Sequence, residues 1–129
     1  MSSRNRSAGH AWELEIVNAL KPFFPEVASS RSCNRVRDGE KCDLAYPDEA
    51  KLGRFPFNIQ AKTTAGTLNY NSLLDEMPTE EIRVVLHRRT KKSVGGKFVA
   101  KSKVAVMPYE DFLILAAIVS NVRKQNAQK

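Results

Sequence analysis

Apolar and polar residues alternate within one stretch of the chain, residues 55–64. Its apolar positions are Phe55, Phe57, Ile59 and Ala61, and the polar positions between and beyond them are Asn58, Gln60 and Lys62. A period of two is typical of a β-strand with one apolar face, so we expect this stretch to be a strand. Gln60 and Lys62 then project from the same face, roughly 7 Å apart.

Weaker patterns on either side of this strand predict the remaining elements. We expect helices at 8–24, at 69–77 and from Pro108 to about residue 123, and strands at 27–32, 42–46, 82–89 and 98–107. Gly95 and Gly96 favour a hairpin with a basic tip between the last two strands. This succession of helices and strands predicts an α/β fold.

Length and composition indicate a single domain. The chain has 129 residues, of which 42% are hydrophobic and 27% charged, so we expect one domain over 1–129 with flexible ends at 1–8 and 124–129. The longest apolar run, residues 112–119, is far shorter than the roughly 20 residues that cross a bilayer. Cys33 and Cys42 have no histidine at metal spacing, which favours reduced thiols and a cytoplasmic location over a zinc site.

Charge is distributed unevenly along the chain. The formal net charge is +7, from 21 Lys and Arg against 14 Asp and Glu. Residues 43–82 carry a net charge of −4, whereas residues 83–129 carry +9. An acidic middle and a basic last third suit a protein that holds a divalent cation and binds a polyanion. The alternative is charge that serves only solubility.

Three polar side chains are candidates for chemistry. If Asp43 approaches from a neighbouring strand, its carboxylate joins the Gln60 amide and the Lys62 ammonium in a small volume. Carboxylate and amide oxygens can hold Mg²⁺, and a lysine can stabilise charge or position an attacking water beside a phosphate. The alternative is a polar, solvated sheet face.

The first helix contributes one further acid. With about 100° between successive helix residues, Glu13 falls between Leu20 and Val17 on the apolar face, whereas Glu15 falls between two alanines. A carboxylate on an apolar face is costly unless it is paired or serves a metal site. Glu13 is therefore the preferred candidate.

Together these residues resemble the conserved motifs of a known enzyme superfamily. Residues 9–15 opening a helix, Arg31 and Ser32, Asp43 and the stretch 59–62 are similar in order and spacing to the PD-(D/E)xK nuclease superfamily. Within it, the chain resembles the archaeal-type Holliday junction resolvases and their phage-encoded relatives. The resemblance covers about residues 9–62 and implies a restriction-endonuclease-like mixed β-sheet flanked by helices.

The resemblance also implies roles for individual residues. The ligands of a Mg²⁺ site, in which Mn²⁺ can substitute, would be Glu13, Asp43, Gln60 and the backbone carbonyl of Ala61. Lys62 would be the catalytic lysine. Ser30, Arg31 and Ser32 would correspond to a serine-bearing segment that contacts the scissile strand in the relatives.

Gln60 departs from the family pattern, because most members carry Glu or Asp there. An amide oxygen binds Mg²⁺ more weakly than a carboxylate, and the site loses one negative charge. Three interpretations stay open: a natural Q-x-K variant that still cuts, a weakened or engineered enzyme, and a relative that only binds. The presence of Glu13, Asp43 and Lys62 favours the first.

DNA contacts are expected mainly along the hairpin. The basic residues there are Arg88, Arg89, Lys91, Lys92, Lys97, Lys101 and Lys103. Flexible basic side chains can reach phosphates without reading bases, although a solvated hairpin tip is the alternative. The apolar stripe of Phe112, Leu115, Ala116 and Val119 indicates either core or a dimer surface.

We therefore expect a Mg²⁺-dependent, structure-selective endodeoxyribonuclease of the junction-resolvase type, in the cytoplasm of a prokaryotic cell, including a phage-infected one. A two-fold homodimer would present two sites to the matching strands of a branched DNA. One alternative is a restriction-like or nicking endonuclease on linear duplex. Another is a junction-binding or DNA-binding module without catalysis.

Overall fold

The computed structural model describes residues 3–92 and 98–128, and the side chains of 8–91 and 101–128. Its elements in chain order are α1 (Ser3–Leu20), β1 (Ala28–Ser29), α2 (Ser30–Cys33), α3 (Arg35–Gly39), β2 (Leu44–Ala45), α4 (Glu49–Leu52), β3 (Phe57–Thr64), α5 (Tyr70–Asp75), β4 (Ile82–Lys92), β5 (Phe98–Val106) and α6 (Tyr109–Ala127). In this part of the chain no helix is both long and apolar enough to cross a bilayer.

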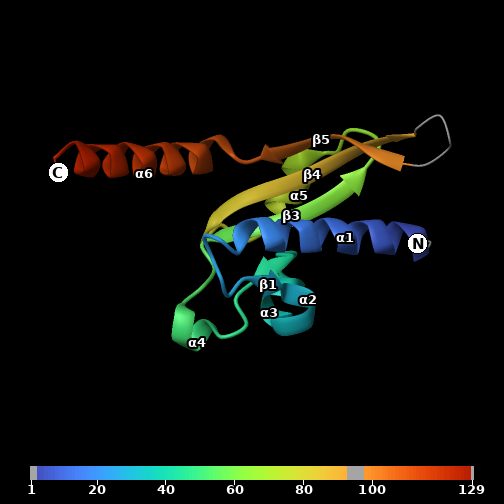
Figure 1. Ribbon diagram of the computed structural model, residues 1–129, viewed down its shortest axis with the longest axis horizontal. Helices are drawn as coiled ribbons and strands as arrows, with labels where there is room; N and C mark the ends of the chain where they lie inside the picture. Colours follow the sequence, from blue (N-terminus) through green and yellow to red (C-terminus); the bar gives the residue numbers. More distant parts are fainter. Residues whose placement is uncertain (1–2, 93–97, 129) are drawn as a thin grey trace.

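The main sheet has three strands in the order β3, β4, β5 (Figure 1). β3 and β4 run parallel, whereas β4 and β5 form an antiparallel pair. The short strands β1 and β2 pair separately, also antiparallel. A mixed α/β fold with a mixed sheet is thus confirmed. The hairpin is confirmed as the β4–β5 pair, while its expected tip at Gly95, Gly96 and Lys97 lies outside the described residues.

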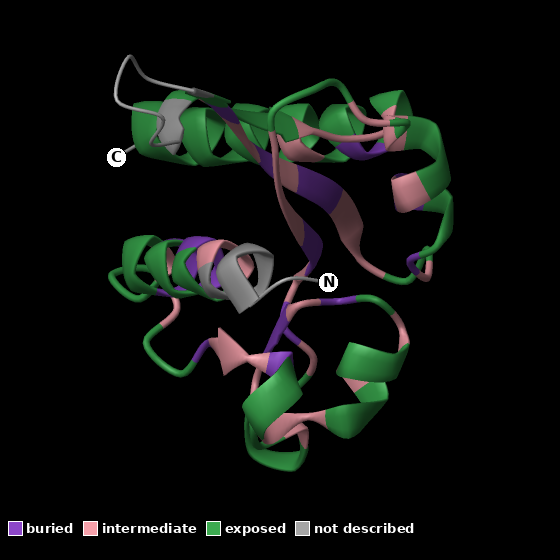
Figure 2. Cartoon of the chain, turned by 90° about the vertical axis from the view of Figure 1, so that its right-hand side faces the viewer, coloured by how far each residue is buried: buried purple, intermediate pink, exposed green. Residues whose placement is uncertain are grey.

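Helices pack on both faces of the sheet. α1 packs on the face that carries Ile59 and Val84, and the buried side chains there include Trp12, Ile16, Val17 and Phe55. On the opposite face α5 packs against β4, around Leu74, Met77 and Val85. The Trp12 indole nitrogen donates to the Leu86 carbonyl at 2.9 Å and ties α1 to β4. Figure 2 shows the buried residues concentrated in the strands and on the inner side of α1.

The strand expected at 55–64 is present as β3, but its polar face is not solvated. Asn58 and Gln60 are only 2% and 4% exposed. Their apolar neighbour Ile59 is buried as well, against α1. The interpretation of these residues as a polar, solvated face is therefore wrong, and each buried amide needs hydrogen-bond partners.

The strand expected at 27–32 is wrong beyond Ser29. The chain turns into α2 at Ser30, whose buried hydroxyl donates to the Cys42 carbonyl. Two residues later α3 begins, with the Asn34 side chain accepting from the Arg37 amide as an N-cap. Caps and buried hydrogen bonds of this kind stabilise short helices that have no repeating apolar pattern. The helices α2, α3 and α4 were therefore not predicted from the sequence.

The two long helices differ from the expected bounds. α1 begins at Ser3 and ends at Leu20, not at residue 24, and α6 continues to Ala127, so helix reaches into both segments expected to be flexible. Pro108 precedes α6, and Glu110 and Asp111 lie in its first turn. After that turn, α6 extends away from the sheet (Figure 1).

Candidate functional site

Asp43 lies beside β3, on the edge away from β4. Its backbone amide donates to the Ile59 carbonyl at 2.7 Å, and its carboxylate Oδ2 accepts from the Ala61 amide at 2.8 Å. The N–H and C=O of one strand residue point to the same edge, so the Ala61 carbonyl points to the Asp43 side as well. Asp43 thus meets the condition set out above, because it lies beside the strand that carries Gln60 and Lys62.

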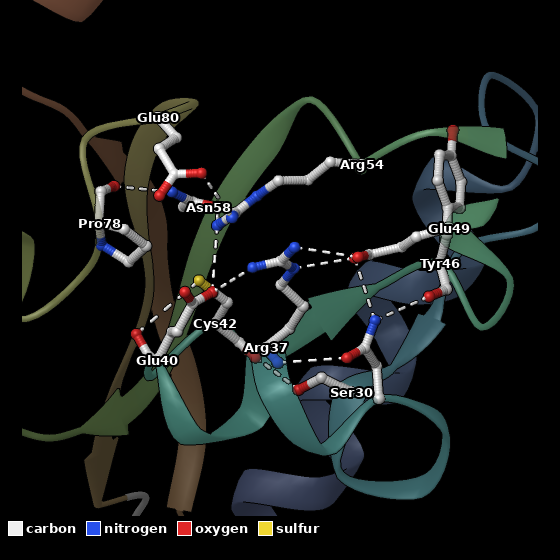
Figure 3. A network of polar contacts seen from close by, with 11 residues as sticks. Ser30, Arg37, Glu40, Cys42, Tyr46, Glu49, Arg54, Asn58, Pro78 and Glu80 are labelled. Carbon is white, nitrogen blue, oxygen red and sulfur yellow. Dashed lines mark hydrogen bonds and ion pairs between the residues drawn. The ribbon is translucent and has the colours of Figure 1, made fainter.

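A polar network holds the segment that carries Asp43 (Figure 3). The Arg37 guanidinium binds Glu49 through two contacts, at 2.8 and 2.9 Å, and Glu40 at 2.6 Å. Arg54 contacts Glu40 at 3.2 Å and also the Asn58 amide oxygen at 2.9 Å, on the strand of the candidate site. The network therefore links the loop before Asp43 to β3.

The segment also contains a strained residue. Lys41 has a φ of 67°, in the left-handed region that side chains other than glycine rarely adopt. The following residue, Cys42, donates its backbone amide to the Arg37 carbonyl at 3.0 Å. The turn at Lys41 thus brings the chain back against α3 immediately before Asp43.

Asp43 has an unusual protonation equilibrium. Burial, and to a smaller extent the charge of Glu13, raise the pKa of its carboxyl to about 6. The Ala61 amide and the charges of Lys62 and Arg31 act in the opposite direction. A buried acid, Glu13, and a half-buried one, Asp43, raise each other's cost of ionisation next to cations, and a bound divalent cation would neutralise such a pair.

Glu13 is buried on α1, 6% exposed, whereas the Glu15 side chain is about half exposed. The placement of Glu13, rather than Glu15, on the apolar face of the helix is confirmed. Its carboxylate pairs with Arg31 at 3.0 Å and accepts from the Ser29 hydroxyl at 3.4 Å. Arg31 therefore neutralises Glu13, and its own side chain is 63% exposed.

Of the two polar atoms of the Gln60 amide, one has a hydrogen-bond partner among the described residues and the other has none. Its Nε2 donates to Glu76 Oε2 at 3.2 Å. Its Oε1 is buried and has no hydrogen-bond partner among the described residues. Glu76, the residue that follows α5, was not a sequence candidate, because a contact across 16 residues leaves no local pattern.

Lys62 lies half-buried on the same face of β3 as Gln60. Its neighbour across the parallel pair is His87, which is fully buried between the Thr64 hydroxyl and the Tyr70 hydroxyl, each at 2.8 Å. Burial lowers the His87 pKa, so this ring is neutral near pH 7. His87 fixes the end of β3 and α5 relative to each other and has no exposed surface for substrate.

The donor set fits a hard divalent cation. Asp43 and Gln60 offer oxygen atoms, and the unpartnered Gln60 Oε1 is an acceptor that requires a donor or a cation. No cluster of three or more His, Cys, Asp or Glu residues suited to a metal occurs in the described part of the chain. Any such site here therefore depends on the amide oxygen of Gln60 as well as on the two acids.

The expected DNA-binding residues divide between two faces. Arg89 shares the face of Gln60 and Lys62, whereas Arg88 shares the opposite face with Lys103. The Nε atoms of both arginines are buried without a partner among the described residues. Lys91 is exposed, the side chain of Lys92 lies outside the described part, and Lys97 is entirely outside it.

The residues of the serine-bearing segment, 30–32, differ in their exposure. Ser30 is fully buried. Arg31 and Ser32 are exposed, and the Ser32 hydroxyl donates to the Ser29 carbonyl at 3.0 Å. Only Arg31 and Ser32 are thus open to a partner, and Ser30 holds the segment against Cys42. The two cysteines, Cys33 and Cys42, are both free.

The chain matches no protein-family model, no curated protein and no solved structure.

Proposed function

We propose that the protein is a Mg²⁺-dependent DNA endonuclease with a PD-(D/E)xK-type site on a restriction-endonuclease-like core. The observation that carries this proposal is the buried Oε1 of Gln60, which has no partner among the described residues, on the strand that also carries Lys62 and hydrogen-bonds to Asp43. Without a cation or another donor, this acceptor would cost about 1–3 kcal/mol. The same strand thus provides a metal ligand and a cation for the phosphate.

The residues of the site have separate roles in this mechanism. Asp43, Gln60, Glu13 and the Ala61 carbonyl would hold Mg²⁺, which when bound supplies an activated water and neutralises phosphate charge. Lys62 stabilises the negative charge that develops on the phosphate during attack. Arg31 exchanges its pairing with Glu13 for a phosphate contact, since a guanidinium binds either anion.

We place branched DNA first among substrates. The cations near the site, Arg31 and Arg89, are suited to phosphates, which provide affinity but carry no sequence information. A two-fold homodimer would nick two matching strands of a four-way junction. This gives a junction resolvase. Its proposed location is the cytoplasm of a prokaryotic cell, including a phage-infected one.

A second candidate is a DNA-binding module without catalysis. Gln60 lacks the charge of a carboxylate, and Glu13 is already neutralised by Arg31. Both features weaken a metal site, although neither weakens phosphate binding. Linear duplex as the substrate is the remaining alternative within the nucleases.

The deciding experiment compares a labelled immobile four-way junction with the matching linear duplex, each in Mg²⁺ and in EDTA. We expect paired symmetric nicks on the junction, lost in EDTA, and loss of cutting with retained binding in Asp43→Asn and Lys62→Ala. Lys51→Ala, an exposed lysine on α4, and Glu15→Gln are the matched controls and should cut normally. Binding without cutting in Mg²⁺ would establish the second candidate instead, and nicks on the duplex alone would establish the linear substrate.

Glu76 has a positioning role in this proposal. By accepting from Gln60 Nε2, it turns the amide so that Oε1 remains available. We expect Glu76→Ala to weaken Mg²⁺ binding several-fold, measured by calorimetry without DNA, whereas Glu76→Gln keeps an acceptor and the affinity. Equal affinities in wild type and Glu76→Ala would remove Glu76 from the site.

Gln60 itself can be tested only together with Glu76. In Gln60→Glu alone, two carboxylates would lie where the amide now donates at 3.2 Å, and they would repel each other. The double variant Gln60→Glu with Glu76→Gln keeps one acid and one amide in exchanged places. Faster cutting by the double variant would show that the natural residue attenuates the enzyme.

A further inference from the structure

Glu13 and Arg31 form an ion pair whose two partners differ in their freedom to move. Arg31 Nη2 lies 3.0 Å from Glu13 Oε2. The arginine side chain is 63% exposed, whereas the glutamate side chain is only 7% exposed. Arg31 can therefore turn its charge into solvent or toward another anion, while Glu13 stays where α1 holds it.

The backbone on either side of this pair is fixed. Ser30 donates its amide to the Asp43 carbonyl at 2.9 Å, so the residue before Arg31 is tied to the segment that carries Asp43. The Ser29 hydroxyl donates to Glu13 Oε1 at 3.4 Å. The ion pair can thus open by a movement of the Arg31 side chain alone.

The Arg31 guanidinium is close to both acids of the proposed metal site. Besides pairing with Glu13, its charge opposes the rise that burial causes in the pKa of Asp43. Both Glu13 oxygens already accept a hydrogen bond, Oε1 from Ser29 and Oε2 from Arg31. A metal ion at Glu13 would face the guanidinium at close range, and like charges repel more strongly in a partly buried site than in water.

We propose that Arg31 is a gate on the metal site. Without DNA it stays on Glu13 and keeps the Mg²⁺ affinity low, and with DNA it moves to a phosphate and leaves Glu13 open to the metal. Since this gate regulates the proposed Mg²⁺ site, it rests on the proposed function. Mg²⁺ and DNA then bind cooperatively, and by linkage each raises the affinity for the other by the same factor.

The cooperativity follows from the charges of the pair. DNA alone, by drawing Arg31 away, would leave the buried Glu13 carboxylate without a cation, which is strongly unfavourable. Mg²⁺ alone would have to displace the guanidinium without offering it another anion. When both ligands bind, the pair is broken only once, and Glu13 and Arg31 each regain an opposite charge, because a guanidinium binds phosphate as well as carboxylate.

Lys62 separates this gate from simple repulsion between positive charges. The Lys62 charge opposes the burial-raised pKa of Asp43 more than the Arg31 charge does. Unlike Arg31, Lys62 forms no ion pair with the described residues. If Arg31 acted on the metal only as a nearby charge, removing the Lys62 charge would raise the Mg²⁺ affinity at least as much.

Calorimetric titration of Mg²⁺ into the protein without DNA tests the gate. Arg31→Gln removes the charge and keeps a hydrogen-bond donor for Glu13, and we expect it to raise the Mg²⁺ affinity about tenfold. Lys62→Gln is the matched control and should raise the affinity less. Arg31→Lys should bind Mg²⁺ like the wild type, because only one guanidinium nitrogen contacts Glu13. Arg35→Gln, at an exposed arginine of α3, should change nothing, and circular dichroism checks that each variant folds.

The reciprocal effect is measured on DNA in the Lys62→Ala background, in which we expect no cutting. Fluorescence anisotropy gives the affinity for a labelled four-way junction in Mg²⁺ and in EDTA. We expect Mg²⁺ to raise this affinity about tenfold with Arg31 present and only about twofold after Arg31→Gln.

The outcomes distinguish the gate from the metal site itself. Equal Mg²⁺ affinities of the wild type and Arg31→Gln would overturn the gate and leave the metal site in place. A larger effect of Lys62→Gln than of Arg31→Gln would also overturn it, in favour of simple repulsion. If neither the wild type nor Arg31→Gln bound Mg²⁺, with or without the junction, the proposed function would fail together with the gate.

Discussion

The segment that carries Asp43 and helix α6 are held in place by opposite means. The Asp43 segment is polar, and its position depends on the network in which Arg37 and Arg54 bind three glutamates, Glu40, Glu49 and Glu80. α6 is apolar, and beyond its first turn most of its side chains are exposed.

This difference shows what each region requires. Half-buried charges destabilise a fold when a partner is missing. The charges of the Asp43 segment are paired with other residues of the same chain. The exposed apolar side chains of α6 have no such partners among the described residues, and beyond the first turn most of them remain exposed. The segment that carries Asp43 is thus held by contacts within the chain, whereas most of α6 is not.

The largest expected effect is loss of the network in Arg37→Ala. Glu49 and Glu40 would both lose a guanidinium partner, and their side chains are only 26% and 29% exposed. We expect the free energy of unfolding to fall by about 2–3 kcal/mol, measured by urea denaturation. The control Arg35→Ala removes an exposed arginine in the same helix and should change the free energy of unfolding by less than about 0.5 kcal/mol. Equal effects of the two variants would mean that the network does not hold the segment.

The next effect is a pH dependence in the same region. The pKa of Asp43 is raised to about 6 by burial and by Glu13, against an ordinary value of 3.8. Between these two values the folded state binds more protons than the unfolded state, so stability rises as the pH falls. From pH 7 to pH 5 we expect Asp43 to contribute a gain of about 1 kcal/mol, which His87 opposes because its lowered pKa makes the unfolded state bind more protons there.

Asp43→Asn isolates this contribution. The variant should lack this contribution between pH 7 and pH 5, and at pH 7 it should be more stable than the wild type, because it has no carboxylate to ionise in the folded state. Glu49 does not interfere in this window, because Arg37 lowers the Glu49 pKa and that pair is lost only at more acidic pH. A wild type and variant with parallel pH profiles would show that Asp43 titrates normally.

Local patterns predicted a good part of this region. The alternation around Ile59 identified β3, and the helical wheel separated Glu13 from Glu15, because both signals lie within one element. The contact between Gln60 and Glu76 had no such signal, since the fold alone joins residues 16 positions apart. For α6, Phe112 and Val119 read equally well as core or interface, because periodicity reports an apolar face and not what covers it.

A smaller effect should come from the strained turn of the Asp43 segment. Lys41 has a φ of 67°, which costs an ordinary residue about 1 kcal/mol relative to glycine. Lys41→Gly should therefore stabilise the protein by up to about 1 kcal/mol in urea denaturation. If the network imposes the strain, the gain should shrink in the Arg37→Ala background. The same gain in both backgrounds would show that the network does not cause the strain at Lys41.

The smallest effect concerns the contact that joins the hairpin preceding α6 to the body of the protein. Lys103 on β5 lies 3.1 Å from Glu15 on α1 and 5.8 Å from the centre of the Trp12 ring. Both charged side chains are about half exposed, so solvent screens the pair. A double-mutant cycle of Lys103→Ala and Glu15→Ala should give a coupling energy of about 0.5 kcal/mol or less, and added salt should reduce it. A coupling several times larger would mean that the hairpin and α1 stabilise each other strongly. In that case the hairpin, and α6 after it, would share the stability of the Asp43 segment, and the contrast between the two regions would not hold.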